Sequence, residues 1–272
     1  MNKKSRLVLR FRNRRIRNPE KLRRGIYLLP SLFTVGNLLC GYFAILHSMK
    51  GEFGKSALLI LFATVLDALD GKVARLTQST SPFGLELDSL ADMISFGVAP
   101  AVLTHSWGLI NLGRAGWVVS FIYVICGATR LARYNIQAAH ADKKYFVGLP
   151  IPAAAAVLAA TIYSRSVPLA DPLTPLLLCA FLILVSILMV SKNRYRSFKE
   201  VDFRRRKPYL YVVGFALVMA AVAIYPKQTL LLVCYGYLVS GILPRSLVTF
   251  LQSRFHRERS FEQVEDSDPG NH

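Results

Sequence analysis

Long apolar runs separated by short polar segments dominate the chain. Most runs are about twenty residues long, the length that a helix needs to cross the hydrocarbon core of a membrane. The runs lie at residues 28–48, 55–75, 89–109, 116–134, 150–165, 172–191, 208–225 and 228–247. The pattern predicts an all-α fold, a polytopic transmembrane helix bundle with about eight spans.

The distribution of charge supports this topology. Lys and Arg number 34 against 16 acids, which gives a net charge of +18. If the N-terminus is cytoplasmic, 29 of the 34 basic residues fall in cytoplasmic segments and five on the other side. This is the positive-inside distribution of membrane proteins. Topology thus accounts for most of the charge, and we expect no nucleic-acid partner.

Four aspartates stand inside the apolar spans, whereas the other twelve acids lie in tails, loops or at span edges. Asp67 and Asp70 belong to the second span, and Asp88 and Asp92 to the third. An ionisable residue at membrane depth costs about 2.5–3.5 kcal/mol on insertion scales. Four carboxylates therefore need a compensating positive charge, or they must be partly protonated.

Helical geometry puts these aspartates on two stripes. At 100° per residue, Asp67 and Asp70 share one face of the second helix with Gly71 and Ala74. On the third helix Asp88 and Asp92 share a stripe with Gly84, provided that the helix begins near Gly84. A short turn joins the two helices, so we expect antiparallel neighbours whose acidic faces meet near the cytoplasmic surface.

Converging carboxylates suit hard divalent cations with oxygen ligands. Two such cations about 3.5–4 Å apart can hold both the attacked phosphate and its leaving group. A cation- or proton-coupled transporter also clusters intramembrane acids, and it stays the alternative from another functional class. The confinement of the acids to one hairpin, toward one surface, favours the metal site.

The spacing of these residues resembles a family signature. Eight positions within 26 residues match the motif of the CDP-alcohol phosphatidyltransferases: Asp67, Asp70, Gly71, Ala74, Arg75, Gly84, Asp88 and Asp92. The resemblance implies a six-helix core, homodimers and dependence on Mg²⁺ or Mn²⁺, with two ions expected. It also implies that the four aspartates bind metal, that Asp92 is the general base, and that the motif's other four residues contact the nucleotide.

The sequence around the motif is similar to that of the family members that use serine. Residues 29–45, 84–101, 130–135 and 146–155 carry this similarity, which runs from about residue 29 to 190. The resemblance implies phosphatidyl transfer from CDP-diacylglycerol to L-serine, giving phosphatidylserine and CMP. The motif alone does not distinguish serine from glycerol 3-phosphate or an inositol phosphate, so those acceptors remain alternatives.

Polar residues outside the motif are candidate substrate ligands. Arg130, Arg133 and Asn135 end the fourth span, where basic residues also satisfy the positive-inside pattern and the helix dipole. The functional interpretation is that one arginine binds the lipid phosphate or the serine carboxylate. Asn37 in the first span either joins helices, as polar residues in membranes often do, or contacts substrate.

The expected organisation follows from these segments. We expect a basic cytoplasmic segment at 1–27, a catalytic core at 28–191, a basic cytoplasmic loop at 192–207, two accessory spans at 208–247 and a cytoplasmic tail at 248–272. The end of the tail is expected to be disordered. We expect the protein to lie in the cell membrane, in contact with membrane lipids. Both termini and the active site should lie on the cytoplasmic side.

Overall fold

A computed structural model gives the fold. The structure describes residues 19–76, 81–138, 145–167, 173–191, 194–196 and 208–242. Within these ranges, backbone alone is described for residues 19–30, 75, 137–138, 145–147, 194–196, 208–212, 215, 218 and 242. The predictions for the 192–207 loop and the 248–272 tail, and most of that for 1–27, lie outside the described residues.

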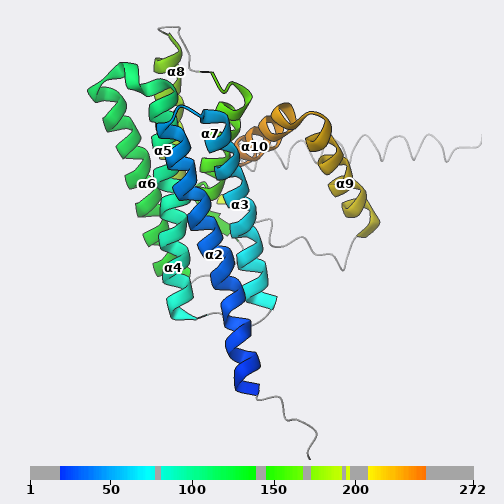
Figure 1. Cartoon of the computed structure of the whole chain (residues 1–272). Coiled ribbons are helices and arrows are strands. Elements are labelled where there is room, and N and C mark those ends of the chain that lie inside the picture. The colour runs from blue at the N-terminus through cyan, green and yellow to red at the C-terminus, as the bar shows by residue number, and fades with distance from the viewer. Residues whose placement is uncertain are drawn as a thin grey trace, which may run out of the picture.

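Helices make up nearly all of the described chain (Figure 1). The α-helices are α2 (Pro19–Met49), α3 (Phe53–Leu76), α4 (Pro82–Asp92), α5 (Ala99–Thr104), α6 (Arg114–Ala138), α7 (Ile151–Ser164), α8 (Leu173–Val190), α9 (Pro208–Ile224) and α10 (Pro226–Ile242). Three η segments interrupt or end the third long helix: η1 (Met93–Val98), η2 (His105–Leu109) and η3 (Ile110–Leu112). Two short strands, β1 (Tyr145–Val147) and β2 (Arg194–Arg196), pair antiparallel and were not predicted.

The helices correspond to the eight apolar runs, and the membrane character of the fold is clear. Four described helices are long and apolar enough to cross a membrane: Ser31–Met49, Pro82–Leu112, Arg114–Ile136 and Leu173–Val190. Helix α3 is not one of these four because its second half carries two aspartates and Lys72, and α7 has only 14 residues. The chain is therefore a multi-pass membrane helix bundle, while the count of eight spans stays a prediction.

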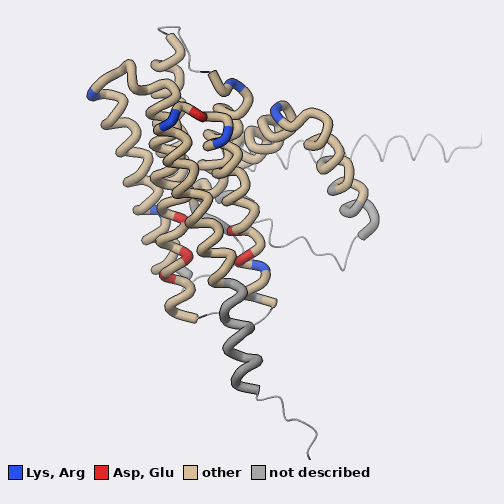
Figure 2. Tube along the Cα trace, in the orientation of Figure 1, with Lys and Arg blue, Asp and Glu red and all other residues tan. Residues whose placement is uncertain are grey.

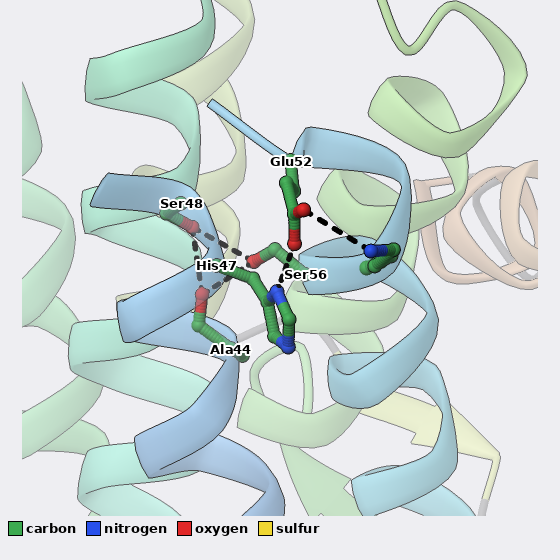
Figure 3. Close-up of polar contacts among 6 residues, drawn as sticks. Ala44, His47, Ser48, Glu52 and Ser56 are labelled. Carbon is green, nitrogen blue, oxygen red and sulfur yellow. Dashed lines mark hydrogen bonds and ion pairs between the residues drawn. The ribbon is translucent and has the colours of Figure 1, made fainter. Parts of the chain in front are cut away.

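Helices α2 and α3 form an antiparallel hairpin closed by a short turn (Figure 1). Beside this turn the hydroxyls of Ser48 and Ser56 both donate to the Ala44 carbonyl, at 2.9 and 2.8 Å, and lie 2.7 Å apart (Figure 3). All three residues are buried, so these contacts satisfy polar groups that would otherwise be costly to bury. They join the two helices at the end of the hairpin.

An ion-pair cluster covers the same turn. The Nδ1 atom of His47 lies 2.5 Å from a carboxylate oxygen of Glu52, and Lys55 Nζ lies 3.1 Å from the other oxygen (Figure 3). Hydrogen bonds from Lys55 and then His47 hold the pKa of Glu52 below its ordinary value. Glu52 therefore links the last turn of α2 to the first turn of α3.

The third long helix changes its winding immediately after Asp92. Residues Met93–Val98 form the π-helical segment η1, and such segments occur frequently at functional sites. Here η1 lies against α2: a Cβ added to Gly41 would come within 2.7 Å of the Ser95 Cα. The close approach lets the Ser95 hydroxyl donate to the Asn37 carbonyl at 2.8 Å. A glycine on α2 thus permits a direct contact with the helix that carries Asp92.

The remaining helices complete the bundle. Helix α6 packs against α8 and is fixed to η1 by the buried Tyr123, whose hydroxyl donates to the Phe96 carbonyl at 2.9 Å. Helix α7 packs against α3, and α10 packs against α7. Tyr235 of α10 stacks on Phe181, with ring centroids 5.8 Å apart. Helix α9 extends away from the bundle beyond α10, as Figure 1 shows.

Candidate active site

Three of the four predicted metal ligands converge. Ligand atoms of Asp67 on α3 and of Asp88 and Asp92 on α4 lie within 4.8 Å of one another. Figure 2 shows acidic positions of α3 and α4 gathered at one end of the bundle, opposite the α2–α3 turn. Helix α4 begins at Pro82 with Ser81 as its N-cap, so the expected stripe of Asp88 and Asp92 forms. The predicted convergence is confirmed for these three carboxylates.

Asp70 has a different partner. Its carboxylate accepts a short hydrogen bond from the Thr34 hydroxyl of α2, and both residues are buried. Asp70 lies three residues after Asp67, on the same face of α3, but it is not part of the group of three carboxylates. The structure therefore supports a nearby position for Asp70 and leaves its metal role a prediction.

Helix α2 also contributes to the site, a possibility that the sequence left open through Asn37. It packs against both α3 and α4, so the aspartate stripes meet beside α2 and not through a simple two-helix contact. It supplies Thr34 to Asp70, and Asn37 Nδ2 donates to an Asp92 carboxylate oxygen at 3.2 Å. Thr34 and Asn37 are three residues apart and so share a face of α2.

The role of Thr34 could not be recognised in advance. A lone threonine in an apolar run is common, because its hydroxyl can bond to the helix's own backbone. The i, i+3 pair with Asn37 was the available signal, but it does not show which neighbouring helix the pair faces. Packing of α2 against α3 and α4 supplies that information.

The donor set fits a hard divalent cation. Carboxylate oxygens are the ligands that Mg²⁺, Mn²⁺ and Ca²⁺ prefer. Asp67 and Asp88 are half-buried and Asp92 is buried, so their mutual repulsion is poorly screened by water. A bound cation would relieve this repulsion. The three carboxylates therefore form a group that could hold a metal ion.

Arg130 supplies a buried positive charge close to this group. The residue lies on α6 with 6% of its surface exposed, and its charge interacts with the Asp92 carboxylate. Its guanidinium also lies over the Tyr134 ring, 6.0 Å from the centroid. Within the described part of the chain, the Arg130 Nε has no hydrogen-bond partner. Arg130 is thus a buried cation whose charge acts on Asp92, and its predicted role as a substrate ligand stays a prediction.

The other two residues at the end of α6 have structural partners. Arg133 Nη1 donates to the Val190 carbonyl at 3.1 Å and so binds the C-terminal end of α8. Asn135 Nδ2 donates to the Ser89 hydroxyl of α4 at 2.9 Å. Both contacts hold α6 to its neighbours. They favour Arg130 over Arg133 and Asn135 as a substrate ligand.

The predicted nucleotide-binding positions lie on the same two helices. Gly71 is exposed, and a Cβ added there would meet no described atom within 4 Å. Ala74 is half-buried one turn later. The Gly84 amide donates to the Ser81 hydroxyl at 3.0 Å, which caps α4. The Arg75 side chain lies outside the described residues.

Comparison with known proteins decides the family. The model of the CDP-alcohol phosphatidyltransferase family matches residues 27–191, which include all four aspartates. The chain belongs to the CDP-alcohol phosphatidyltransferase family. Its identity as a family member confirms the resemblance carried by the aspartate motif.

Three relatives of the chain have the same name, CDP-diacylglycerol–serine O-phosphatidyltransferase. The chain is 37% identical to the protein of Helicobacter pylori, over 86% of the chain and 98% of that relative. It is 38% identical to the protein of Bacillus subtilis, over 63% of the chain and 92% of the relative. It is 35% identical to the protein of Methanocaldococcus jannaschii, over 81% of the chain and 95% of that relative.

The family match at residues 27–191 agrees with the resemblance recognised from about residue 29 to 190. One relative matches a longer part of the chain. The Helicobacter pylori match covers 236 residues, more than the 191 residues up to the end of the family match, so it must continue into the segment of α9 and α10. That similarity is not confined to the catalytic motif and its flanks.

Proposed function

We propose that this protein transfers the phosphatidyl group of CDP-diacylglycerol to the hydroxyl of L-serine, forming phosphatidylserine and releasing CMP. The observation that carries the proposal is the convergence of Asp67, Asp88 and Asp92 within the segment that matches the family. The shared name of the relatives supports serine as the acceptor.

The reaction requires one proton transfer and one exchange of bonds at phosphorus. The serine hydroxyl oxygen attacks the phosphorus that bears diacylglycerol, and a new P–O bond forms. The bond from that phosphorus to the CMP oxygen breaks, and CMP leaves with the electron pair. Asp92 accepts the hydroxyl proton. Asn37 holds the Asp92 carboxylate through its 3.2 Å hydrogen bond, which orients the base toward the acceptor.

The aspartates are proposed to bind the metal, with Asp67, Asp88 and Asp92 as direct ligands and Asp70 near them. Two Mg²⁺ or Mn²⁺ ions would supply positive charge for the phosphates and for the departing CMP. Gly71 and Ala74 leave room beside the carboxylates for the nucleotide, and Arg75 and Gly84 complete the proposed nucleotide site. Asp70 keeps its orientation through Thr34.

The position of the site suits a lipid substrate. The aspartates lie toward one end of the bundle, so acyl chains can remain in the membrane while serine and the nucleotide arrive from water (Figure 2). The positive-inside pattern supports a cytoplasmic location for this end and for both termini. Residues 28–191 are the proposed core, and α9 and α10 are accessory spans in a protein that we expect to form homodimers.

Release of CMP from CDP-diacylglycerol by purified, detergent-solubilised protein tests the proposal. L-Serine, glycerol 3-phosphate and an inositol phosphate would each be offered as acceptor. We expect release with L-serine alone. Release with another acceptor would assign a different family activity. A protein that releases no CMP with any acceptor, yet moves a cation or protons across proteoliposomes, would be a transporter.

A further inference from the structure

The acceptor must be recognised by groups outside the aspartate motif, and this inference rests on the proposed transfer to serine. L-Serine carries a hydroxyl, an ammonium and a carboxylate. Asp92 is the proposed base for the hydroxyl. The ammonium therefore needs a hydrogen-bond acceptor, and the carboxylate needs a cation, both close to Asp92. Among the residues that the structure describes, Asn37 and Arg130 are buried polar groups of these kinds whose hydrogen bonds are incomplete.

Asn37 offers the acceptor. The residue is 1% exposed, and its Nδ2 is engaged by Asp92. Its carbonyl oxygen Oδ1 has no hydrogen-bond partner among the described residues. Burial and the hydrogen bond from Nδ2 to Asp92 hold the side chain in place. A buried acceptor without a donor is costly, so a ligand that donates to it there gains affinity.

Arg130 offers the cation. It is 6% exposed, its Nε lacks a partner within the described residues, and Asp92 is the carboxylate with which its charge interacts. No direct ion pair joins Arg130 to Asp92 in the described part of the chain, so the guanidinium keeps capacity for another anion. A guanidinium binds a carboxylate well because its planar donors match the two oxygens.

We propose that Asn37 and Arg130 form the serine subsite, with Asn37 Oδ1 accepting from the ammonium and the Arg130 guanidinium binding the carboxylate. The hydroxyl oxygen and the ammonium nitrogen of serine are three bonds apart. They can therefore reach neighbouring groups such as the Asp92 carboxylate and the Asn37 amide, which are in hydrogen-bond contact. Asn37 has two roles in this arrangement: its Nδ2 orients the base Asp92, and its Oδ1 binds the serine ammonium.

Acceptor analogues separate the two contacts. Ethanolamine lacks the carboxylate, and 3-hydroxypropionate lacks the ammonium. Each would be measured as a competitive inhibitor of serine for the wild type and for Arg130→Ala and Asn37→Ala. A hydrogen bond to a charged group corresponds to about a tenfold to hundredfold change in affinity. We expect Arg130→Ala to raise the serine KM by this factor and leave ethanolamine inhibition nearly unchanged.

Asn37→Ala should give the complementary result. The serine KM and the inhibition constant of ethanolamine should rise by a similar factor, whereas that of 3-hydroxypropionate should change little. Loss of Asp92 orientation would lower kcat, but it would not alter the ratio between the analogues. Arg133→Ala is the matched control for Arg130, because Arg133 binds the Val190 carbonyl. Its analogue ratios should equal those of the wild type.

The conservative variants Arg130→Lys and Asn37→Gln serve if the alanine variants do not fold. We expect both to retain serine turnover with an intermediate rise in serine KM. Wild-type protein without serine-dependent CMP release would overturn the proposed function itself. If the wild type uses serine but the variants keep the wild-type ratio between the inhibition constants of ethanolamine and 3-hydroxypropionate, the proposed serine subsite is wrong. A rise confined to the KM for CDP-diacylglycerol would instead assign these residues to the lipid phosphate.

Discussion

Asp92 is the most buried of the three carboxylates that converge, and its polar neighbours come from several helices. Its carboxylate accepts a hydrogen bond from Asn37. It is repelled by the charges of Asp67 and Asp88 and attracted by the charge of Arg130. Its 9% exposure removes it from most of the surrounding water. This environment distinguishes Asp92 from the half-buried Asp67 and Asp88, and it supports the role of a positioned base.

Replacement of Asp92 by Asn should impair chemistry more than substrate binding. The amide keeps the size of the side chain but cannot take the hydroxyl proton, and a positioned base contributes about 10²–10⁴-fold to rate. We expect kcat to fall by that factor with little change in affinity for CDP-diacylglycerol. Asp67→Asn and Asp70→Asn should lower both kcat and the affinity for CDP-diacylglycerol. Wild-type turnover by Asp92→Asn would show that another group accepts the proton.

The aspartates were predictable as a group because their spacing is a helical pattern with a chemical meaning. Their hydrogen-bond partners on α2 were harder to predict. Asn37 was noticed as a polar residue at membrane depth, but its contact with Asp92 spans 55 residues of sequence. Arg130 and Arg133 looked equivalent on the sequence, since both end the same helix. Packing separates them: one is buried beside Asp92, and the other binds the end of α8.

At the scale of helices, the contact between α2 and η1 determines how Asn37 meets Asp92. Gly41 permits this approach, and the π-helical winding of η1 changes the direction of the side chains after Asp92. Periodicity at 100° per residue describes a regular helix and could not predict η1. The sequence therefore predicted a helix over 89–109 correctly but not its internal change of geometry.

Gly41→Ala should destabilise the protein. Its Cβ would lie 2.7 Å from the Ser95 Cα, and overpacking of this kind typically costs about 1–3 kcal/mol. Gly36→Ala on the same helix is the control, because its Cβ would meet only Leu66 Cδ1 at 3.4 Å. Melting temperatures in detergent should fall for Gly41→Ala and hardly change for Gly36→Ala. Equal melting temperatures would contradict the close helix contact.

The α2–α3 turn gives a pH-dependent prediction. The pKa of Glu52 is lowered in the fold, so its ionised form stabilises the hairpin above the ordinary glutamate pKa of about 4.3. This contribution is lost as the pH falls through the lower folded value. Glu52→Gln should therefore melt below the wild type at pH 7, and the difference should vanish in acid. Glu86→Gln, at an exposed position, is the control. A difference that persists unchanged at pH values where Glu52 is protonated in both the folded and unfolded states would rule out this role for Glu52.

At the scale of the whole molecule, opposite ends of the bundle have different chemistry. One end carries the aspartates, and the other carries the compact ion-pair cluster of the α2–α3 turn (Figures 2 and 3). Hydropathy predicted the helices and the distribution of basic residues predicted an orientation. Neither predicted that α9 would extend from the bundle or that β1 would pair with β2, because both depend on contacts between distant segments.

Incorporation of labelled L-serine into lipid tests metal-dependent transfer to serine most directly. Purified wild-type protein would be treated with EDTA, desalted and supplied with CDP-diacylglycerol and labelled serine in detergent micelles. We expect no labelled phosphatidylserine until Mg²⁺ or Mn²⁺ is added, and then label in lipid together with an equal amount of CMP. Full incorporation by the metal-free protein, or CMP release without labelled lipid, would contradict metal-dependent transfer to serine.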